Sequence, residues 1–326
     1  MIRKVAENIY RIRIPLSVPL LDSMNSYVIK DPDRSLIVDT GMMQTQCHTA
    51  MMAGLAKSEV DAGRADYFMT HHHGDHFGLV SRLLTEEAVI YMSRREVDLV
   101  ERIGSRRILP DVAHFVEITG FPETNLQRII PSKAGMEYQR EKPWPFRLVE
   151  DGDILEKGGH RFRCILTPGH APGHMCLYDE ENRILISGDH LLRNITPAIQ
   201  LRSDNENPLA DYRKSLQILH SMDIDLVLPG HGSPFRNCRK RIEQIEKHHE
   251  QRAAEVLAAL SRGDKNAYEV ASLIPWSIVD FEGWEGVPLL QKFFATGEAF
   301  SHLKYLEGEG KVRKEMKAGR LIYSLT

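Results

Sequence analysis

The stretch THHHGDHFG, residues 70–78, places four histidines and one aspartate within nine positions. It follows a short apolar run at 67–69 that is typical of a strand, and a helix is expected to begin near Phe77. Imidazole and carboxylate groups that leave a strand end at this spacing can face two adjacent metal ions. The candidate ligands are His71, His73, Asp75 and His76. With His72 and Gly74 as spacers, the pattern favours a metal centre over a catalytic dyad or a polar loop.

Three further motifs place histidine or aspartate directly after an apolar run. TPGHAPGH (167–174) follows FRCILT, SGDH (187–190) follows ILI, and PGHG (229–232) follows DLVL. Strand ends that carry such side chains to one edge of a fold provide what a binuclear metal site needs. Each of these motifs therefore offers histidine or aspartate side chains as candidate ligands. His174 is expected to be structural.

The composition describes an ordinary globular chain. Its 326 residues are 42% hydrophobic and 27% charged, which suits one large domain plus a smaller one. The net charge of -3 creates no overall basic field that would attract nucleic acid or anionic lipid. The N-terminus alternates like a strand and no apolar run is long enough for a membrane span, so we expect a soluble, cytoplasmic protein. Four widely spaced cysteines are expected to be reduced and mostly buried.

Apolar periodicity divides the chain into strands and helices. Glycine and polar residues between apolar runs predict hairpin turns at Gly158-Gly159 and near Glu181-Asn182. Residues 104–147 lack a clean period and are interpreted as an insertion that packs over another part of the protein. His248 and His249 are expected on the solvated face of a long helix. The predicted strands are 9–14, 26–29, 36–38 and 67–69, with a strand running into a loop at 225–232, and the predicted helices include 45–60, 93–103, 208–222 and 239–262.

In this order, the motifs HxHxDH, TPGH, SGD and PGHG resemble the metallo-β-lactamase superfamily of metallohydrolases. VDTG at 38–41 is similar to the early strand and turn of that superfamily, and the resemblance covers roughly 5–250. It implies an α+β fold, a four-layer αββα sandwich, here with a helical insertion and a small C-terminal winged-helix domain. The expected domains are a catalytic domain at 1–250, with the insertion at about 104–147, and a winged-helix-like domain at 251–326.

The same resemblance implies two divalent metal ions. Zinc is the first choice because all the donors are nitrogen or oxygen, and iron or manganese also accept such a set. His73 stands where redox diiron members of the superfamily carry glutamate, which argues against that branch. Asp39 would tie down the ligand loop. One metal would be held by His71, His73 and His170, the second by Asp75, His76 and His231, and Asp189 would bridge them.

Two metal ions that share a water lower its pKa toward roughly 7, so hydroxide becomes available as a nucleophile. Asp75 is best placed to orient this water or accept its proton, and His190 is a candidate proton donor or substrate contact. We expect hydrolysis of a small ester-like substrate, with a thioester or lactone first, because the apolar insertion could cover a modest pocket. The chain is similar to hydroxyacylglutathione hydrolases, but its C-terminal region does not look like their glutathione-binding domain.

Three alternative functions stay open. The winged-helix branch of the superfamily includes an endoribonuclease, and 311–320 carries five Lys or Arg against one Glu, so RNA could bind through this basic wing. The interpretation preferred for the wing is that it docks on the catalytic domain or on a second subunit of a homodimer. A mononuclear iron persulfide dioxygenase would use similar ligands. A metal-dependent binding or regulatory protein is the third alternative.

Overall fold

The computed structural model of the protein describes residues 2–18, 21–122, 138–140, 142–200, 203–276 and 283–326. Contacts divide the chain into two compact units. Unit 1 consists of 1–106, 135–197 and 215–242, and unit 2 of 107–134, 198–214 and 243–326. All four cysteines are buried and free, as the sequence predicts. None of the described helices is both long and apolar enough to cross a lipid bilayer.

Unit 1 is built on two β-sheets. Sheet A has the strand order β1-β2-β3-β4-β5-β6-β7, and it is antiparallel up to β4 and parallel from β4 onward. Its strands are β1 (Ile2–Ala6), β2 (Ile9–Val18), β3 (Leu21–Ile29), β4 (Ser35–Val38), β5 (Ala65–Phe68), β6 (Ile90–Met92) and β7 (Phe146–Leu148). The predicted early strands are therefore confirmed, and β2 and β3 are longer than the sequence pattern indicates.

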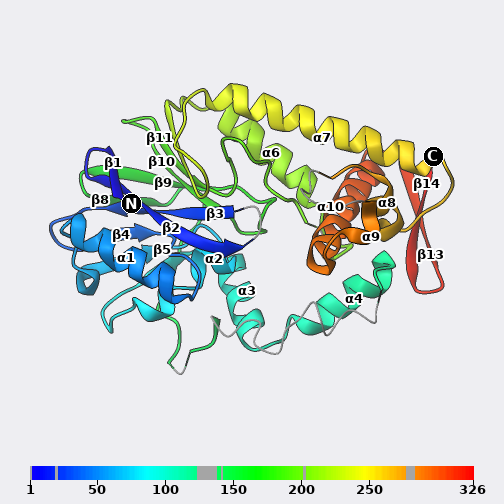
Figure 1. Ribbon diagram of the computed structural model, residues 1–326. Helices are drawn as coiled ribbons and strands as arrows, with labels where there is room; N and C mark the ends of the chain where they lie inside the picture. Colours follow the sequence, from blue (N-terminus) through cyan, green and yellow to red (C-terminus); the bar gives the residue numbers. More distant parts are fainter. Residues whose placement is uncertain (1, 19–20, 123–137, 141, 201–202, 277–282) are drawn as a thin grey trace. The chain divides into compact units, whose positions relative to one another are not determined.

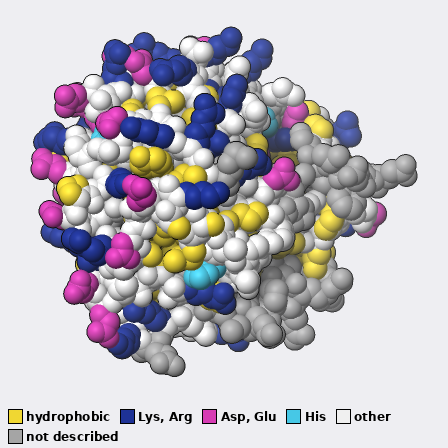
Figure 2. Space-filling model, turned by 60° about the vertical axis from the view of Figure 1, so that its left-hand side comes forward, with side chains coloured by type: hydrophobic (Ala, Val, Ile, Leu, Met, Phe, Trp, Pro, Cys, Tyr) yellow, Lys and Arg dark blue, Asp and Glu magenta, His cyan; other side chains and the backbone are white. Residues whose placement is uncertain are grey.

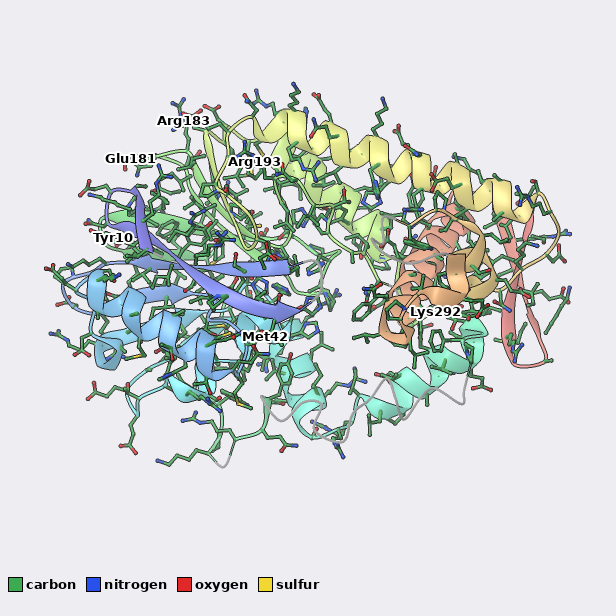
Figure 3. All side chains as sticks on the ribbon, viewed as in Figure 1. Tyr10, Met42, Glu181, Arg183, Arg193 and Lys292 are labelled. Carbon is green, nitrogen blue, oxygen red and sulfur yellow. The ribbon has the colours of Figure 1, made fainter. Side chains whose placement is uncertain are left out.

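Sheet B has the order β12-β11-β10-β9-β8, and only β11 and β12 are parallel. Its strands are β8 (Ile154–Lys157), β9 (His160–Leu166), β10 (Met175–Asp179), β11 (Ile184–Gly188) and β12 (Leu226–Pro229). Both predicted hairpins are present. The β8–β9 turn needs positive φ at Gly158 and Gly159, which glycine adopts without strain. At the β10–β11 turn, labelled by Glu181 and Arg183 in Figure 3, Arg183 forms an ion pair of 2.7 Å with Asp225.

Alternating apolar side chains explain the layers of unit 1. In β4, Leu36 and Val38 pack with sheet B residues such as Phe162, whereas Ile37 packs with Leu55 of α1 on the opposite face. Figure 1 shows α1 lying against the strands of sheet A. The α-helices that lie wholly in this unit are α1 (Thr45–Lys57), α2 (Gly74–Phe77) and α3 (Arg94–Gly104), and its short 3₁₀ helices are η1 (Ala62–Arg64) and η2 (Val80–Arg82). Because both faces of sheet A are covered, its strand ends are held rigidly.

Two helices have residues in both units. They are α6 (Pro208–Ser221) and α7 (Cys238–Leu260). In unit 1, the hydroxyl of Ser215 on α6 donates to the carbonyl of Pro168 just after β9, at 2.9 Å. Helix α6 therefore contacts the loop that follows β9. The helices and sheets together confirm the mixed α and β class predicted from the sequence.

Unit 2 has its own aromatic core. The ring of Phe115 lies 5.0 Å from that of Phe293 and 6.2 Å from that of Phe300. Its further elements are α4 (Leu109–Thr119), α8 (Ala267–Leu273), α9 (Gly283–Gly286), α10 (Leu289–Gly308), β13 (Val312–Lys317) and β14 (Arg320–Leu325). Thus α4, which lies within the predicted insertion, packs in unit 2, while 123–137 and 141 lie outside the described residues. The expected helix and hairpin of the C-terminal segment are present, but its winged-helix identity and the predicted domain boundaries stay predictions.

The expectation that His249 lies on a solvated face is wrong. Its side chain is buried in unit 2, and its Nδ1 lies 3.3 Å from Nε2 of His302 on α10. Nδ1 of His302 donates to the carbonyl of Glu298 at 2.9 Å, so its Nε2 accepts from His249 and both rings are neutral. Burial lowers the pKa of His249 to about 2 and that of His302 to about 4. The charged neighbours of His249 in the sequence concealed this helix contact.

We expect low pH to reduce the free energy of unfolding that His302 contributes, compared with an asparagine that does not titrate. The folded-state pKa of His302 lies below its unfolded value of 6.5, so its stabilisation is present above pH 6.5 and falls as the pH drops toward 4. His302→Asn should therefore be less stable than the parent at pH 7.5, and the gap should shrink at pH 5. Thermal unfolding at both pH values measures it, with exposed His114→Asn as a control. A gap that stays constant or widens in acid would contradict the assignment.

Candidate metal centre

Strand direction brings the predicted ligand loops together in unit 1. In sheet A, β4 and β5 are parallel, so Asp39 after β4 and the loop 70–76 after β5 leave the same edge. In sheet B, β9 and β11 are each antiparallel to β10, and β12 is parallel to β11, so all three end at one edge. The loops that follow these three strands carry His170, Asp189 and His231. The centre is therefore assembled from both sheets, as the motif positions predict.

The first donor group contains His71, His73 and His170. Nδ1 of His73 lies 3.0 Å from Nε2 of His71 and 3.1 Å from Nε2 of His170. One ligand atom from each residue lies within 4.8 Å of the other two. The hydroxyl of Thr70 is 2.9 Å from Nδ1 of His71, which directs the Nε2 atom of that ring at its neighbours. These three imidazoles could hold one metal ion.

The second donor group contains Asp75, His76 and His231. Nε2 of His231 lies 3.3 Å from Nε2 of His76 and 3.2 Å from Oδ2 of Asp75. The three ligand atoms again lie within 4.8 Å of one another. Two nitrogens and one carboxylate oxygen form a second set that could hold a metal ion.

Asp189 lies between the two donor groups. Its Oδ2 is 3.3 Å from His231 Nε2, 3.4 Å from His76 Nε2 and 3.8 Å from His170 Nε2. Gly230 makes room for it, because a Cβ at position 230 would overlap Oδ1 of Asp189 and the ring of His76. Gly230 of the PGHG motif is therefore required because Asp189 approaches its backbone so closely. The single carboxylate of Asp189 reaches both donor groups.

The hydrogen bonds of the rings show that a cation fits this site. Nδ1 of His76 contacts Asp39 Oδ2 at 2.8 Å, and Nδ1 of His231 donates to the carbonyl of Ser23 at 3.0 Å. When these Nδ1 atoms carry the ring protons, both Nε2 atoms present lone pairs to each other across 3.3 Å. In addition, Oδ1 of Asp189 is buried without a hydrogen-bond partner in the described part of the chain. Lone pairs and a carboxylate that converge in this way repel one another unless protons or metal ions lie among them.

The charges of the site act strongly on one another. Burial alone lowers the pKa of His76, but Asp189, Asp39 and Asp75 outweigh burial and raise it well above its ordinary value. Burial likewise opposes the charge on His231, whereas Asp189 and Asp75 raise its pKa to about 10. Without metal, these two histidines therefore attract protons to the positions that metal ions would take.

Asp39 organises the ligand loop, as the sequence reasoning expects. Its Oδ1 accepts from the backbone N–H of Thr70 at 2.9 Å, and its Oδ2 accepts from the hydroxyl of Thr70 and from Nδ1 of His76. The residue has a φ of 57°, a left-handed conformation that is uncommon for a residue with a side chain. The carboxylate thus fixes the tautomer of His76 and the start of the loop.

Two nearby histidines are enclosed. His190 is fully buried, and burial together with the charge of His170 lowers its pKa to about 3. Its suggested role as a proton donor or substrate contact stays a prediction, and the buried ring does not favour it. His174 is also fully buried, with Nδ1 2.8 Å from the hydroxyl of Thr167, which agrees with the structural role expected for it.

One part of the site was not foreseen. His72, interpreted from the sequence as a spacer, places its Nδ1 2.6 Å from Oε2 of the fully buried Glu96 on α3. Burial opposes ionisation of Glu96, but the interactions with His72 and Gly173 outweigh it and lower the pKa of Glu96. The only local signal is the glutamate in SRRE at 93–96, and that pattern is typical of a helix capping box instead.

The family of the protein follows from comparison with known sequences. The profile described as Metallo-beta-lactamase superfamily matches residues 21–231, which is more than half of the chain. The chain belongs to this superfamily. Membership makes it a metallohydrolase, and its cluster of histidine and aspartate side chains could hold divalent metal ions.

Relatives within the metallo-β-lactamase superfamily extend over most of the chain. The probable metallo-hydrolase YqjP of Bacillus subtilis is 25% identical and aligns with 98% of both chains. An atrochrysone carboxyl ACP thioesterase of Emericella nidulans is 23% identical, over 90% of this chain and 78% of its own length. The crystal structure of a metallo-beta-lactamase family protein from Thermus thermophilus is similar with a TM-score of 0.82 and 27% identity, covering 99% of this chain and 100% of that one.

Metal binding should stabilise the protein. If the converging ligands repel one another, Zn²⁺ added to chelator-treated protein at about 100 times its Kd should raise the free energy of unfolding by about 2.7 kcal/mol. Asp189→Asn should lose much of this gain, since its charge faces both donor groups. The exposed Asp223→Asn serves as a matched control. Unfolding midpoints that do not respond to Zn²⁺ would count against a metal site.

Proposed function

We propose that the protein is a binuclear metallohydrolase that cleaves a small thioester or lactone. The observation that carries the proposal is the pair of donor groups joined by Asp189, whose Oδ2 lies between 3.3 and 3.8 Å from nitrogens of both groups. A carboxylate in this position suits two cations that share it. The proposed ligands are His71, His73 and His170 for one metal, Asp75, His76 and His231 for the other, and Asp189 for both.

Zinc is the proposed metal because imidazole and carboxylate donors suit it. Iron and manganese accept the same donors, so the ligand types do not choose among the three metals. The chemistry that a bound metal pair supplies is Lewis acidity, which lowers the pKa of water toward about 7 and polarises a carbonyl group. The protein contributes the fixed positions of the ligands and the buried surroundings that hold them.

Asp75 is proposed to orient the attacking water or to accept its proton. Its side chain is 21% exposed, compared with 10% for Asp189, so it is the more accessible carboxylate of the site. The second donor group holds Oδ2 at 3.2 Å from His231, which leaves the remaining oxygen for another contact. A carboxylate positioned beside the reacting water acts as a general base.

Proton donors are scarce in the centre, and this favours a thioester. When Nε2 of His76 and Nε2 of His231 bind metal, neither ring can protonate a leaving group, because Nδ1 of His76 bonds to Asp39 and Nδ1 of His231 donates to the carbonyl of Ser23. His190 is buried and neutral. A thiolate leaves more readily without protonation than an alkoxide does, because a thiol has a pKa of about 8.5. The thioesterase relative from Emericella nidulans supports the same substrate class.

The proposed role of the insertion in covering an acyl pocket stays a prediction. The described helix α4 uses Phe115 in the core of unit 2, so that side chain is not available to cover a substrate. Tyr138 of unit 1 instead donates from its hydroxyl to the carbonyl of His72 at 2.7 Å. Residues 123–137, which separate Phe115 from Tyr138 in the sequence, are outside the described residues.

Asp75→Asn should lower kcat on the best substrate of a thioester and lactone panel by about 10²- to 10⁴-fold and should weaken one metal site. The amide keeps the shape of the side chain but loses the charge and the proton acceptor. Metal content is measured beside turnover, and exposed Asp98→Asn is the control. Full activity with full metal content in Asp75→Asn would remove its assigned role, and a panel without turnover above the metal-free protein would remove the substrate class.

The ribonuclease alternative loses support from the surface of the hairpin β13–β14. Nζ of Lys314 lies 2.5 Å from Oδ2 of Asp204 and 3.3 Å from Glu307, and Lys317 pairs with Glu315. These ion pairs neutralise part of the basic wing. Figure 2 draws a different face of the molecule, and basic and acidic side chains are interspersed there too. A phosphate-binding surface would need several unpaired cations.

We therefore expect no measurable binding of single-stranded RNA at low salt. Fluorescence anisotropy of a labelled oligonucleotide measures it, and the double variant Lys311→Glu, Arg313→Glu provides the comparison. Binding by the parent that falls steeply with salt and disappears in the variant would restore the nuclease function.

The remaining alternatives are separated by metal analysis. Protein purified without added metal should contain two zinc ions per chain as a hydrolase and one iron ion as a persulfide dioxygenase. A binding or regulatory protein would hold metal without turnover. Cytoplasmic location and a homodimer stay predictions.

A further inference from the structure

A single buried carboxylate connects two loops that carry proposed ligands. Oε2 of Glu96 accepts from the backbone N–H of His72 at 2.8 Å and lies 2.6 Å from Nδ1 of the same residue. Its Oε1 accepts from the backbone N–H of Gly173 at 2.7 Å. His72 lies between His71 and His73, whereas Gly173 lies three positions after His170. Glu96 therefore touches both loops that supply the first donor group.

Ser93 holds the same loop from the other side. Its hydroxyl donates to the carbonyl of Gly173 at 2.6 Å, so both the N–H and the carbonyl of this residue bond to the first turn of α3. A Cβ at position 173 would overlap the Ser93 hydroxyl and lie 3.1 Å from Cγ of Glu96. Only glycine allows so close an approach.

These contacts replace an ordinary helix cap. The spacing of Ser93 and Glu96 matches a capping box, in which the two side chains would bond N–H groups at the start of their own helix. The hydroxyl of Ser93 makes no such bond, and both oxygens of Glu96 bond to other loops. The first turn of α3 thus gives up a local stabilising interaction and holds loops from two sheets, since His72 follows β5 of sheet A and Gly173 follows β9 of sheet B.

We infer that Glu96, together with Ser93, positions His170 relative to His71 and His73 and thereby sets the affinity of the first metal site. The inference rests on the proposed function, because it assigns a role toward the proposed metal ion. The described hydrogen bonds of Glu96 go to His72 and Gly173 and to no proposed ligand side chain, so it is a positioning residue. Its effect is local to one of the two donor groups, since its described hydrogen bonds reach neither Asp75 nor His231.

Glu96→Gln is the decisive variant because it changes hydrogen bonding with little change in shape. Both oxygens of Glu96 accept hydrogen bonds from backbone N–H groups. In the variant, the NH₂ group of glutamine replaces one of these acceptors, so two donors face each other and one hydrogen bond is lost. We expect the metal affinity of the site formed by the first donor group to fall about tenfold or more, while the affinity of the other site changes little. Glu101→Gln on the same helix, with an exposed side chain, is the matched control and should leave both affinities unchanged.

The experiment titrates Zn²⁺ into metal-free full-length protein in competition with a chromophoric chelator. Co²⁺ spectra report the ligand geometry, and unfolding of the metal-free protein reports stability. Selective weakening of metal binding at one site in Glu96→Gln, with a changed Co²⁺ spectrum, supports the inference. Unchanged affinities at both sites would overturn the inference. Equal weakening at both sites, in proportion to a lower stability of the metal-free protein, would also overturn it, because that result indicates only a structural role.

Two further measurements keep the test decisive. If Glu96→Gln does not fold, Ser93→Ala is tested instead, because it removes only the hydrogen bond to the Gly173 carbonyl. This variant should still weaken metal binding at the first donor group, by a smaller factor. An unchanged affinity would overturn the inference. A parent protein that binds no Zn²⁺ would overturn the proposed function itself, whereas a parent that binds two ions with Glu96→Gln unchanged would overturn only the positioning role.

Discussion

The repulsion between two histidine nitrogens constrains the rest of the structure. Nε2 of His76 and Nε2 of His231 face each other at 3.3 Å, with Oδ2 of Asp189 within 3.4 Å of both. Such groups stay together only when a proton or a cation lies among them and when the surrounding chain prevents them from moving apart. The fold supplies the second condition through the strands from which these residues emerge.

Rigidity comes from the arrangement of the two sheets. The packed layer between them contains Val38, Phe68, Ile186 and Leu228, and each of these lies within a few residues of a proposed ligand or of Asp39. Burial of these side chains fixes the strand ends, and hydrogen bonds such as that of Asn25 to the carbonyl of Gly232 fix the loops beyond them. The same hydrophobic core that stabilises unit 1 therefore also determines the separation of the ligand groups.

The sequence predicted those parts of the site that leave a local pattern. Each of His71, His170 and His231 follows an apolar run that ends in a short motif, so strand polarity alone brings them together. Glu96 was missed because its partners lie 24 and 77 positions away and SRRE has a local explanation as a helix cap. His249 was placed wrongly because helix periodicity among charged neighbours does not reveal a tertiary contact with His302. Pairing between distant segments is the information that local patterns lack.

The division of the chain separates chemistry from the remaining structure. All seven proposed ligands, together with Asp39 and Glu96, belong to unit 1, whereas unit 2 contributes aromatic packing and a neutral histidine pair. Ligand positions thus depend on the two sheets and on the first turn of α3, and changes in unit 2 do not alter them directly. The proposed metal chemistry therefore depends on side chains at the sheet edges of unit 1, and function is carried by such a site and not by the fold as a whole.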